Sequence, residues 1–183
     1  MGFPKPLLPY QGTTFLEHLI VTLNGQVSPL VLVLGAHAER IRATVSIPDS
    51  VVLAINQNYA AGQLSSLQVG LRALPPSVEA AMVALVDHPC VDRALVSRLI
   101  ATWRESRPPV LIPTYQEHRG HPMIFSRELF GELLEAPLDQ GARAVVRRHD
   151  VLHVPVENEG ILHDLDDPVT YRRVTGLEVP IAK

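Results

Sequence analysis

The sequence has very little cysteine, no long apolar run and no large excess of either charge. Cys90 is its one cysteine, so no disulfide bond can form within the chain, which fits a reducing cytoplasm. No apolar run approaches the roughly 20 residues that a membrane-spanning helix needs, and Met1–Pro6 contains no apolar core of a signal peptide. The net charge of −3 argues against a surface for nucleic acid.

The apolar content is that of an ordinary globular domain. The chain has 183 residues, of which 46% are hydrophobic. A chain of this length can bury a sizeable core within one domain. The sequence contains no internal repeat and no low-complexity segment. We therefore predict a single domain over residues 1–183.

Short apolar runs alternate with amphipathic segments along the chain. Strands are expected at Pro29–Gly35, Val51–Ile55, Val83–Asp87, Val110–Pro113, Met123–Phe125 and Val151–Val156. Helices are expected at Thr14–Leu23, Ala36–Thr44, Gly62–Leu74, Val91–Glu105, Arg127–Leu134 and Gly141–Arg148, with a last short one opened by Pro168. Strands without strict alternation, interleaved with helices, indicate a mostly parallel sheet covered on both faces. The fold class is therefore three-layer α/β.

The strand that ends at Asp87 organises this prediction. Its apolar run stops at a carboxylate and is followed by Pro89. Ligands of open α/β sheets bind at the carboxyl ends of the strands, where we expect Asp87 to lie. A second interpretation is that Asp87 caps the helix expected to begin near Val91. Its position alone does not separate these two roles.

Other polar residues also follow predicted strands. They are Asn56, Gly62, Ser65, Ser66, Arg119, Gly120, His121, Asp139, Gly141, Arg143, Asp164 and Asp166. A parallel sheet brings such positions to one edge, where two carboxylates suit Mg²⁺. Each residue also has a plainer interpretation. Asn56 fits a turn, His121 fits a partly buried histidine, and the acidic residues before Pro168 fit a helix start.

Six segments match one family when they are read in order. They are Met1–Pro9, Asn56–Leu67, Leu85–Pro89, Arg119–Pro122, Gly141–Arg143 and Asp164–Pro168. No single segment is decisive, but six at plausible spacing cover nearly the whole chain, to about Tyr171. Together they resemble the MobA-like nucleotidyltransferases, and within them the molybdenum cofactor cytidylyltransferase branch.

The resemblance implies a Rossmann-like fold and an Mg²⁺-dependent reaction. A cytidylyl group would pass from CTP, preferred over GTP, to a molybdopterin-type cofactor, and pyrophosphate would leave. It implies that Asp87 and Asp166 hold the metal and that Lys5 and Asp87 are catalytic. It places the nucleotide against Lys5, Asn56, Gly62 and Ser65, and the acceptor against Gly120, His121, Pro122 and Arg143. A molybdoenzyme is a further partner that it implies, whereas no contact with nucleic acid or a membrane is expected.

The sequence departs from the family at two places. His88 stands where the family usually has glutamine. Family members also open with a strand and a glycine-containing, phosphate-binding loop, and this chain begins at the Met-Gly that follows them. We therefore expect a domain without that strand and loop, belonging to a longer protein. In the rival arrangement, the strand at Leu30–Leu34 pairs directly with the strand ending at Asp87.

Three functions stay open on this basis. The first is cytidylyl transfer to molybdopterin. The second is a non-catalytic relative that binds cofactor or nucleotide during molybdoenzyme maturation, because the missing loop would normally bind the phosphates. The third is nucleotidyl transfer to another small phosphorylated acceptor, because a fold does not fix its substrate.

Overall fold

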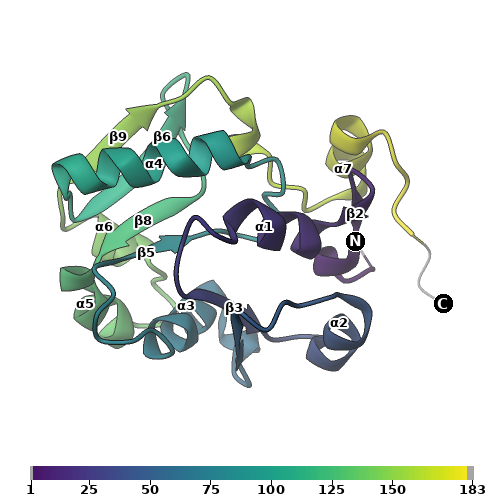
Figure 1. Cartoon of the computed structure of the whole chain (residues 1–183), viewed down its shortest axis with the longest axis horizontal. Helices are drawn as coiled ribbons and strands as arrows, with labels where there is room; N and C mark the ends of the chain where they lie inside the picture. The colour runs from purple at the N-terminus through teal and green to yellow at the C-terminus, as the bar shows by residue number, and fades with distance from the viewer. Residues whose placement is uncertain (1, 181–183) are drawn as a thin grey trace.

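The computed structural model describes residues 2–180, so Met1, which opens the first matched segment, lies outside them. In the view of Figure 1, the helix at Arg93–Ser106 (α4) passes in front of the strands at Val110–Tyr115 (β6) and Val151–Pro155 (β9). The α/β class expected from the sequence is confirmed. Within the described residues, no helix is long and apolar enough to cross a membrane.

The strands form two separate groups. In the first, β3 (Leu30–Leu34) pairs in parallel with β4 (Val51–Ile55). In the second, β5 (Ala80–Val83) pairs with β8 (Met123–Ser126), which pairs with β6 (Val110–Tyr115), and β6 pairs with β9 (Val151–Pro155). β5, β6 and β9 run in one direction, and β8 is inserted antiparallel between β5 and β6. The short β7 (His118–Arg119) is also antiparallel to β6, so the second group is a mixed sheet with three strands in one direction and two in the other. The one mostly parallel sheet expected from the sequence is thus divided into a parallel pair and a mixed sheet.

Each helix expected from the sequence is present, with ends shifted by a few residues. They are α1 (Phe15–Leu23), α2 (Ala38–Thr44), α3 (Gln63–Arg72), α4 (Arg93–Ser106), α5 (Phe130–Glu135), α6 (Arg143–Val146) and α7 (Pro168–Thr175). Short 3₁₀ turns lie at Lys5–Leu7, Tyr59–Ala61, Arg127–Leu129 and Glu159–Leu162. A small antiparallel hairpin of β1 (Pro9–Tyr10) and β2 (Thr13–Thr14) precedes α1, and the strand β7 (His118–Arg119) pairs with β6.

Alternate residues of the second group of strands face two different apolar clusters. Leu111 and Ile124 pack in one cluster with Leu99 and Trp103 of α4. Phe125, the neighbour of Ile124, packs in another cluster with residues of α3, α5 and α6. Side chains alternate between the faces of a strand, so the sheet is buried on both faces. This is the three-layer arrangement.

The strand before Asp87 both begins and ends earlier than predicted, because β5 spans Ala80–Val83 and shares only Val83 with the predicted strand Val83–Asp87. β5 stops at Val83, because its ladder with β8 ends where Val83 faces Met123. Residues 84–87 continue without a strand partner among the described residues. Asp87 is therefore in the turn beyond the strand. It still lies past the carboxyl end of β5, where we expected a ligand-binding residue.

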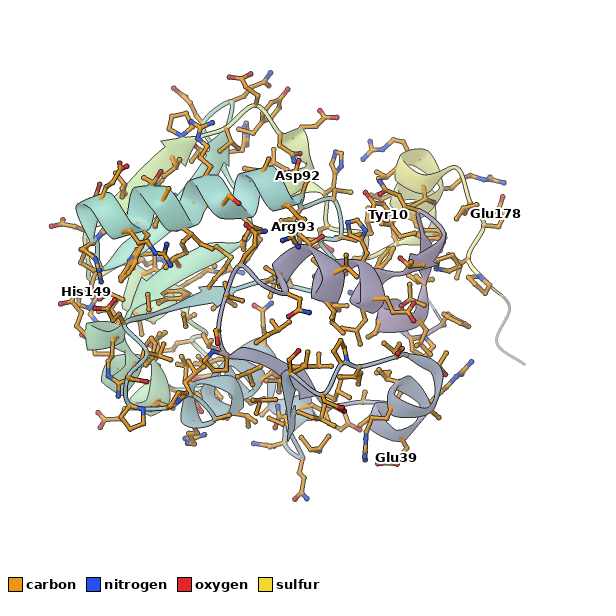
Figure 2. The ribbon with its side chains drawn as sticks, viewed as in Figure 1. Tyr10, Glu39, Asp92, Arg93, His149 and Glu178 are labelled. Atoms are coloured by element: carbon orange, nitrogen blue, oxygen red, sulfur yellow. The ribbon has the colours of Figure 1, made fainter. Side chains whose placement is uncertain are left out.

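Asp92, and not Asp87, caps α4. Its side chain accepts a hydrogen bond from the Leu95 N–H at 2.7 Å. Figure 2 shows Asp92 at the start of this helix, beside Arg93. Arg93 reaches back to α1 and donates to the Val21 carbonyl at 2.7 Å. The start of α4 is thus tied both to its own first turn and to α1, which leaves Asp87 free for another role.

We expect Asp92→Ala to lower the free energy of unfolding by about 1 kcal/mol, because it leaves a helix-terminal N–H without its acceptor. Urea unfolding monitored by circular dichroism measures this. Asp92→Asn is the matched control, since asparagine caps helices as well as aspartate does. Equal losses in both variants would mean that the charge of Asp92, and not its capping hydrogen bond, stabilises the chain.

A cavity separates the two groups of strands. Its volume is about 780 Å³, and it lies between β3 and the segment Ala80–Val86. Apolar side chains of α1, α3 and α4 complete its lining. Within residues 2–180, β3 pairs only with β4, and β5 pairs only with β8. The alternative in which β3 pairs directly with the strand before Asp87 is therefore wrong for this structure.

The facing edges of the cavity run in the same direction. Leu30, at the start of β3, packs in one cluster with Ala80 and Met82 of β5. Leu34, at the end of β3, packs in another cluster with Val86, beyond the end of β5. The backbone groups of β3 and β5 that face the cavity therefore belong to two strand edges that run in the same direction.

Candidate functional site

Lys5 draws two distant carboxylates together beyond the carboxyl end of β5. Its ammonium Nζ lies 3.3 Å from Asp87 Oδ2 and also donates to Asp166 Oδ1. Lys5 comes from the 3₁₀ turn at Lys5–Leu7, and Asp166 comes from the segment before α7. The expectation that Asp87 and Asp166 approach each other is borne out by this geometry. Their role as metal ligands stays a prediction.

Asp164 joins the same group and makes it strongly acidic. Partial burial, a hydrogen bond with Asp166 and the charges of Asp87 and Asp166 raise the pKa of Asp164 to about 6. The hydrogen bond from Lys5 lowers the pKa of Asp166. Burial alone would lower the pKa of Lys5, but the hydrogen bond to Asp166 and the charge of Asp87 outweigh it and raise that pKa. One ammonium therefore faces three carboxylates, which leaves the site ready for a further cation.

Two partly or fully buried histidines, His88 and His121, lie beside this acidic group. The rings of His88 and His121 lie 4.9 Å apart between centroids, with their planes tilted by 50°. Only 8% of His88 is exposed. Burial lowers the pKa of His88. Burial, together with the repulsion that a protonated His88 would exert, lowers the pKa of His121 to about 4. Both rings are therefore neutral at pH 7 and can offer a lone pair.

The residues present fit a divalent cation. Asp87, His88 and Asp164 each offer a donor atom, and the three atoms lie within 4.8 Å of one another. Nδ1 of His88 is buried and has no hydrogen-bond partner among the described residues. Carboxylates and neutral imidazole are established ligands of divalent metals. The sequence prediction named Asp87 and Asp166 as ligands, whereas this donor set replaces Asp166 by His88 and Asp164.

Asn56 and Ser65 organise the loop before α3 by hydrogen bonds within it. The Asn56 side chain donates to Ser65 Oγ at 2.8 Å and to Ser66 Oγ at 2.9 Å. Ser65 Oγ in turn donates to the Gly62 carbonyl at 2.7 Å. Because Asn56 is 2% exposed and Ser65 is 5% exposed, they shape this loop from inside. The turn interpretation of Asn56 describes what the structure shows, and direct contact with a nucleotide stays a prediction.

Gly62 is the exposed corner of the same loop. Its φ of +100° is one that residues with side chains rarely adopt. A Cβ built on Gly62 would meet no described atom within 4 Å. Glycine is therefore required here by its backbone conformation, and the space in front of it is open to a ligand.

The predicted acceptor residues divide into a buried group and an exposed one. A Cβ on Gly120 would lie 2.5 Å from the Ile161 carbonyl oxygen, and the His121 N–H donates to that same oxygen at 3.1 Å. Pro122 is buried behind them. Arg143 is exposed at the start of α6. The structure brings Gly120, His121 and Pro122 to the acidic group through His88, but no described contact brings Arg143 there.

The sequence prediction did not give His88 or Asp164 a ligand role. Asp164 was among the polar residues after the last strand, and His88 was noted only as a departure from the family. Their proximity depends on the turn after β5 meeting the segment before α7, where the Leu165 N–H donates to the Asp87 carbonyl at 2.9 Å. The signal that could have identified them was the pair Asp87-His88 itself, two adjacent potential ligands after one strand.

Comparisons with known proteins agree with this geometry. The MobA-like NTP transferase domain matches residues 1–154. Nicotine blue oxidoreductase of Paenarthrobacter nicotinovorans is 32% identical over 154 residues, which cover 79% of this chain and 74% of that protein. The crystal structure of Rv0371c from Mycobacterium tuberculosis H37Rv matches with a TM-score of 0.83 at 32% identity, over 97% of this chain and 91% of that one.

Two further structures extend the comparison. Rv0371c has also been solved in complex with manganese, and that structure matches with a TM-score of 0.79 at 32% identity, over 94% of this chain and 91% of that one. Molybdopterin-guanine dinucleotide biosynthesis protein A from Archaeoglobus fulgidus matches with a TM-score of 0.70, over 96% of this chain and 90% of that one. Its identity of 18% shows a common fold and nothing further.

Proposed function

Because this chain belongs to the MobA-like NTP transferase family, we propose that it transfers a nucleotidyl group from a nucleoside triphosphate to a phosphorylated acceptor. The observation that carries the proposal is the convergence of Lys5, Asp87 and Asp166 at one edge of the sheet. In its finer form, the proposal names CTP as the donor, a molybdopterin-type cofactor as the acceptor and Mg²⁺ as the metal. The manganese complex of a relative supports a divalent metal.

The reaction makes one phosphorus–oxygen bond and breaks another. A phosphate oxygen of the acceptor attacks the α-phosphorus of the triphosphate. The bond from that phosphorus to the oxygen bridging to the β-phosphorus breaks, and pyrophosphate leaves with the electron pair. No covalent intermediate on the protein is needed, so the protein's tasks are alignment and neutralisation of charge.

Each residue of the site has a task in this scheme. Lys5 carries the positive charge that the triphosphate needs, and it is held at the site by Asp87 and Asp166. The carboxylates of this acidic group would hold the metal, which when bound supplies positive charge to the phosphate oxygens. Lys5 must turn from its carboxylate partners toward the incoming phosphates. Its side chain is 31% exposed, which leaves room for that movement.

The substrates would approach the site from two sides. The open corner at Gly62 supports contact with the base or ribose, since no side chain stands there. The acceptor would bind beside the segment Gly120–Pro122, because His121 of this segment stacks on His88, which lies next to Asp87. Arg143 would reach the acceptor only if a bound substrate extends toward α6.

Release of pyrophosphate tests the transfer directly. The full chain, CTP, Mg²⁺ and molybdopterin cofactor are mixed, and pyrophosphate is measured against CTP consumed, with either substrate omitted as a control. We expect pyrophosphate only when both substrates are present, in equal amount to the CTP lost. Release of pyrophosphate with another phosphorylated acceptor, and not with molybdopterin cofactor, would support nucleotidyl transfer but assign a different acceptor. Tight nucleotide binding with no release for any acceptor would support the non-catalytic alternative.

We expect CTP to bind more tightly than GTP. The preference comes from the resemblance of the later segments to the cytidylyltransferase branch, and calorimetric titration of each nucleotide in Mg²⁺ measures it. A difference of about tenfold in dissociation constant corresponds to about 1.4 kcal/mol. Tighter binding of GTP would assign the chain to guanylyl transfer instead.

A further inference from the structure

We propose that this site binds its metal through a histidine nitrogen, with Asp87, His88 and Asp164 as ligands, and therefore takes a first-row transition metal such as Mn²⁺ in preference to Mg²⁺. The inference deepens the proposed function, since it names the metal and the ligand set of the same site. It differs from the pair Asp87 and Asp166 that the family resemblance implies.

The donor geometry is the first reason. The three donor atoms of Asp87, His88 and Asp164 lie within 4.8 Å of one another. Two ligands on opposite sides of a cation with bonds of about 2.1 Å lie about 4.2 Å apart. Small side-chain rotations would therefore bring all three atoms onto one ion. Asp166 is not a member of this group of donor atoms.

The condition of His88 is the second and independent reason. The residue is 8% exposed, and its Nδ1 is buried with no hydrogen-bond partner among residues 2–180. A buried polar atom without a partner costs free energy, so such an atom in a native protein calls for an explanation. A metal ion bound to His88 through Nδ1 would remove that cost.

The surroundings of the ring are those of a metal-bound histidine. The Ile161 backbone acts on His88 in the direction that raises its pKa, against the larger effect of burial, and the His121 ring stacks on the face of His88. Histidines that bind metals commonly donate their other N–H to a backbone carbonyl, which fixes the ring and leaves the remaining nitrogen with a lone pair. Gly120 keeps this arrangement compact, because a Cβ there would meet the Ile161 carbonyl at 2.5 Å.

Ligand chemistry sets the choice of metal. An all-oxygen site suits Mg²⁺, whereas imidazole nitrogen suits the first-row transition metals. Lys5 pairs with Asp87 and Asp166, but its single positive charge leaves the three carboxylates with a net negative charge, which favours a divalent ion at Asp87, His88 and Asp164. The site can then hold metal and ammonium together, side by side at the position of the triphosphate.

Electron paramagnetic resonance with Mn²⁺ alone tests the proposal on the full chain. Loss of the free-ion signal gives the dissociation constant of Mn²⁺, and displacement by Mg²⁺ gives the preference. Nitrogen modulation in the spin-echo spectrum reports a bound imidazole. We expect Mn²⁺ to bind at least about tenfold more tightly than Mg²⁺, with clear nitrogen modulation from the unaltered chain.

Two pairs of variants locate the ligands. We expect His88→Gln to lose the nitrogen modulation and about tenfold in Mn²⁺ affinity, while His118→Gln, at an exposed histidine elsewhere, changes neither. We expect Asp164→Asn to weaken Mn²⁺ more than Asp166→Asn does. A thermal unfolding transition for each variant checks that the variant is folded. The nitrogen modulation of the unaltered chain tests the proposal even if a variant does not fold.

The results separate this inference from the proposed function. An oxygen-only spectrum, equal affinity for Mg²⁺ and Mn²⁺, or a larger loss in Asp166→Asn than in Asp164→Asn would overturn the inference, even if pyrophosphate is released. Nitrogen-bound Mn²⁺ in a chain that releases no pyrophosphate would retain the inference and reject the transferase reaction.

Discussion

Replacement of Asp87 by asparagine is expected to lower nucleotidyl transfer by at least about 10²-fold, because the site loses a carboxylate that would hold the metal and Lys5 beside the reacting phosphates. The free energy of unfolding should change little. The Lys5–Asp87 pair is partly exposed, so its contribution to the free energy of unfolding is within about 1 kcal/mol. Removing one of three neighbouring carboxylates also relieves repulsion with Asp164.

The measurement pairs initial rates of pyrophosphate release with urea unfolding of the same preparation. Asp150→Asn is the control, since Asp150 is exposed and precedes β9 on a different part of the chain. A large loss of rate with unchanged unfolding assigns Asp87 to catalysis. A variant that keeps its rate in Mg²⁺ and in Mn²⁺ would remove Asp87 from the site.

Local signals in the sequence predicted most of the fold. Thr14 and Glu17 form the expected capping box at the start of α1, with the Thr14 N–H donating to Glu17 at 2.9 Å. The strand Val51–Ile55 has the predicted bounds as β4. Both features depend on neighbouring residues of the chain, so no knowledge of distant contacts was needed.

Features that depend on distant segments were predicted less well. β5 ends at Val83 because β8, some forty residues later in the chain, stops pairing there. The candidate site shows the same division. Lys5, Asp87 and Asp166, which the resemblance assigned to one site, lie together, and their roles there stay predictions. The inward hydrogen bonds of Asn56 and the burial of His88 come from packing that a single sequence does not reveal.

An added strand in the cavity between β3 and β5 is expected to stabilise the chain by roughly 3 kcal/mol or more. The cavity of about 780 Å³ has apolar walls and two parallel edges without strand partners. Lys5 lies beside Asp87, so the start of the chain reaches the site from the carboxyl end of these edges. A segment joined before Gly2 by a glycine-containing loop would therefore enter the cavity parallel to both edges.

The design is a five-residue apolar strand and loop fused before Gly2, with the gain read from urea unfolding. Backbone groups of β3 and β5 would pair with the added strand on both sides, and its side chains would contact α1, α3 and α4. Because proline cannot donate to a ladder, the same fusion with two prolines in the strand is the control. If both fusions unfold at the same urea concentration as the 183-residue chain, the cavity does not accept a strand. A gain for the apolar fusion alone would show that the sheet is completed by a strand at this position, and faster pyrophosphate release from it would connect that strand and its loop to phosphate binding.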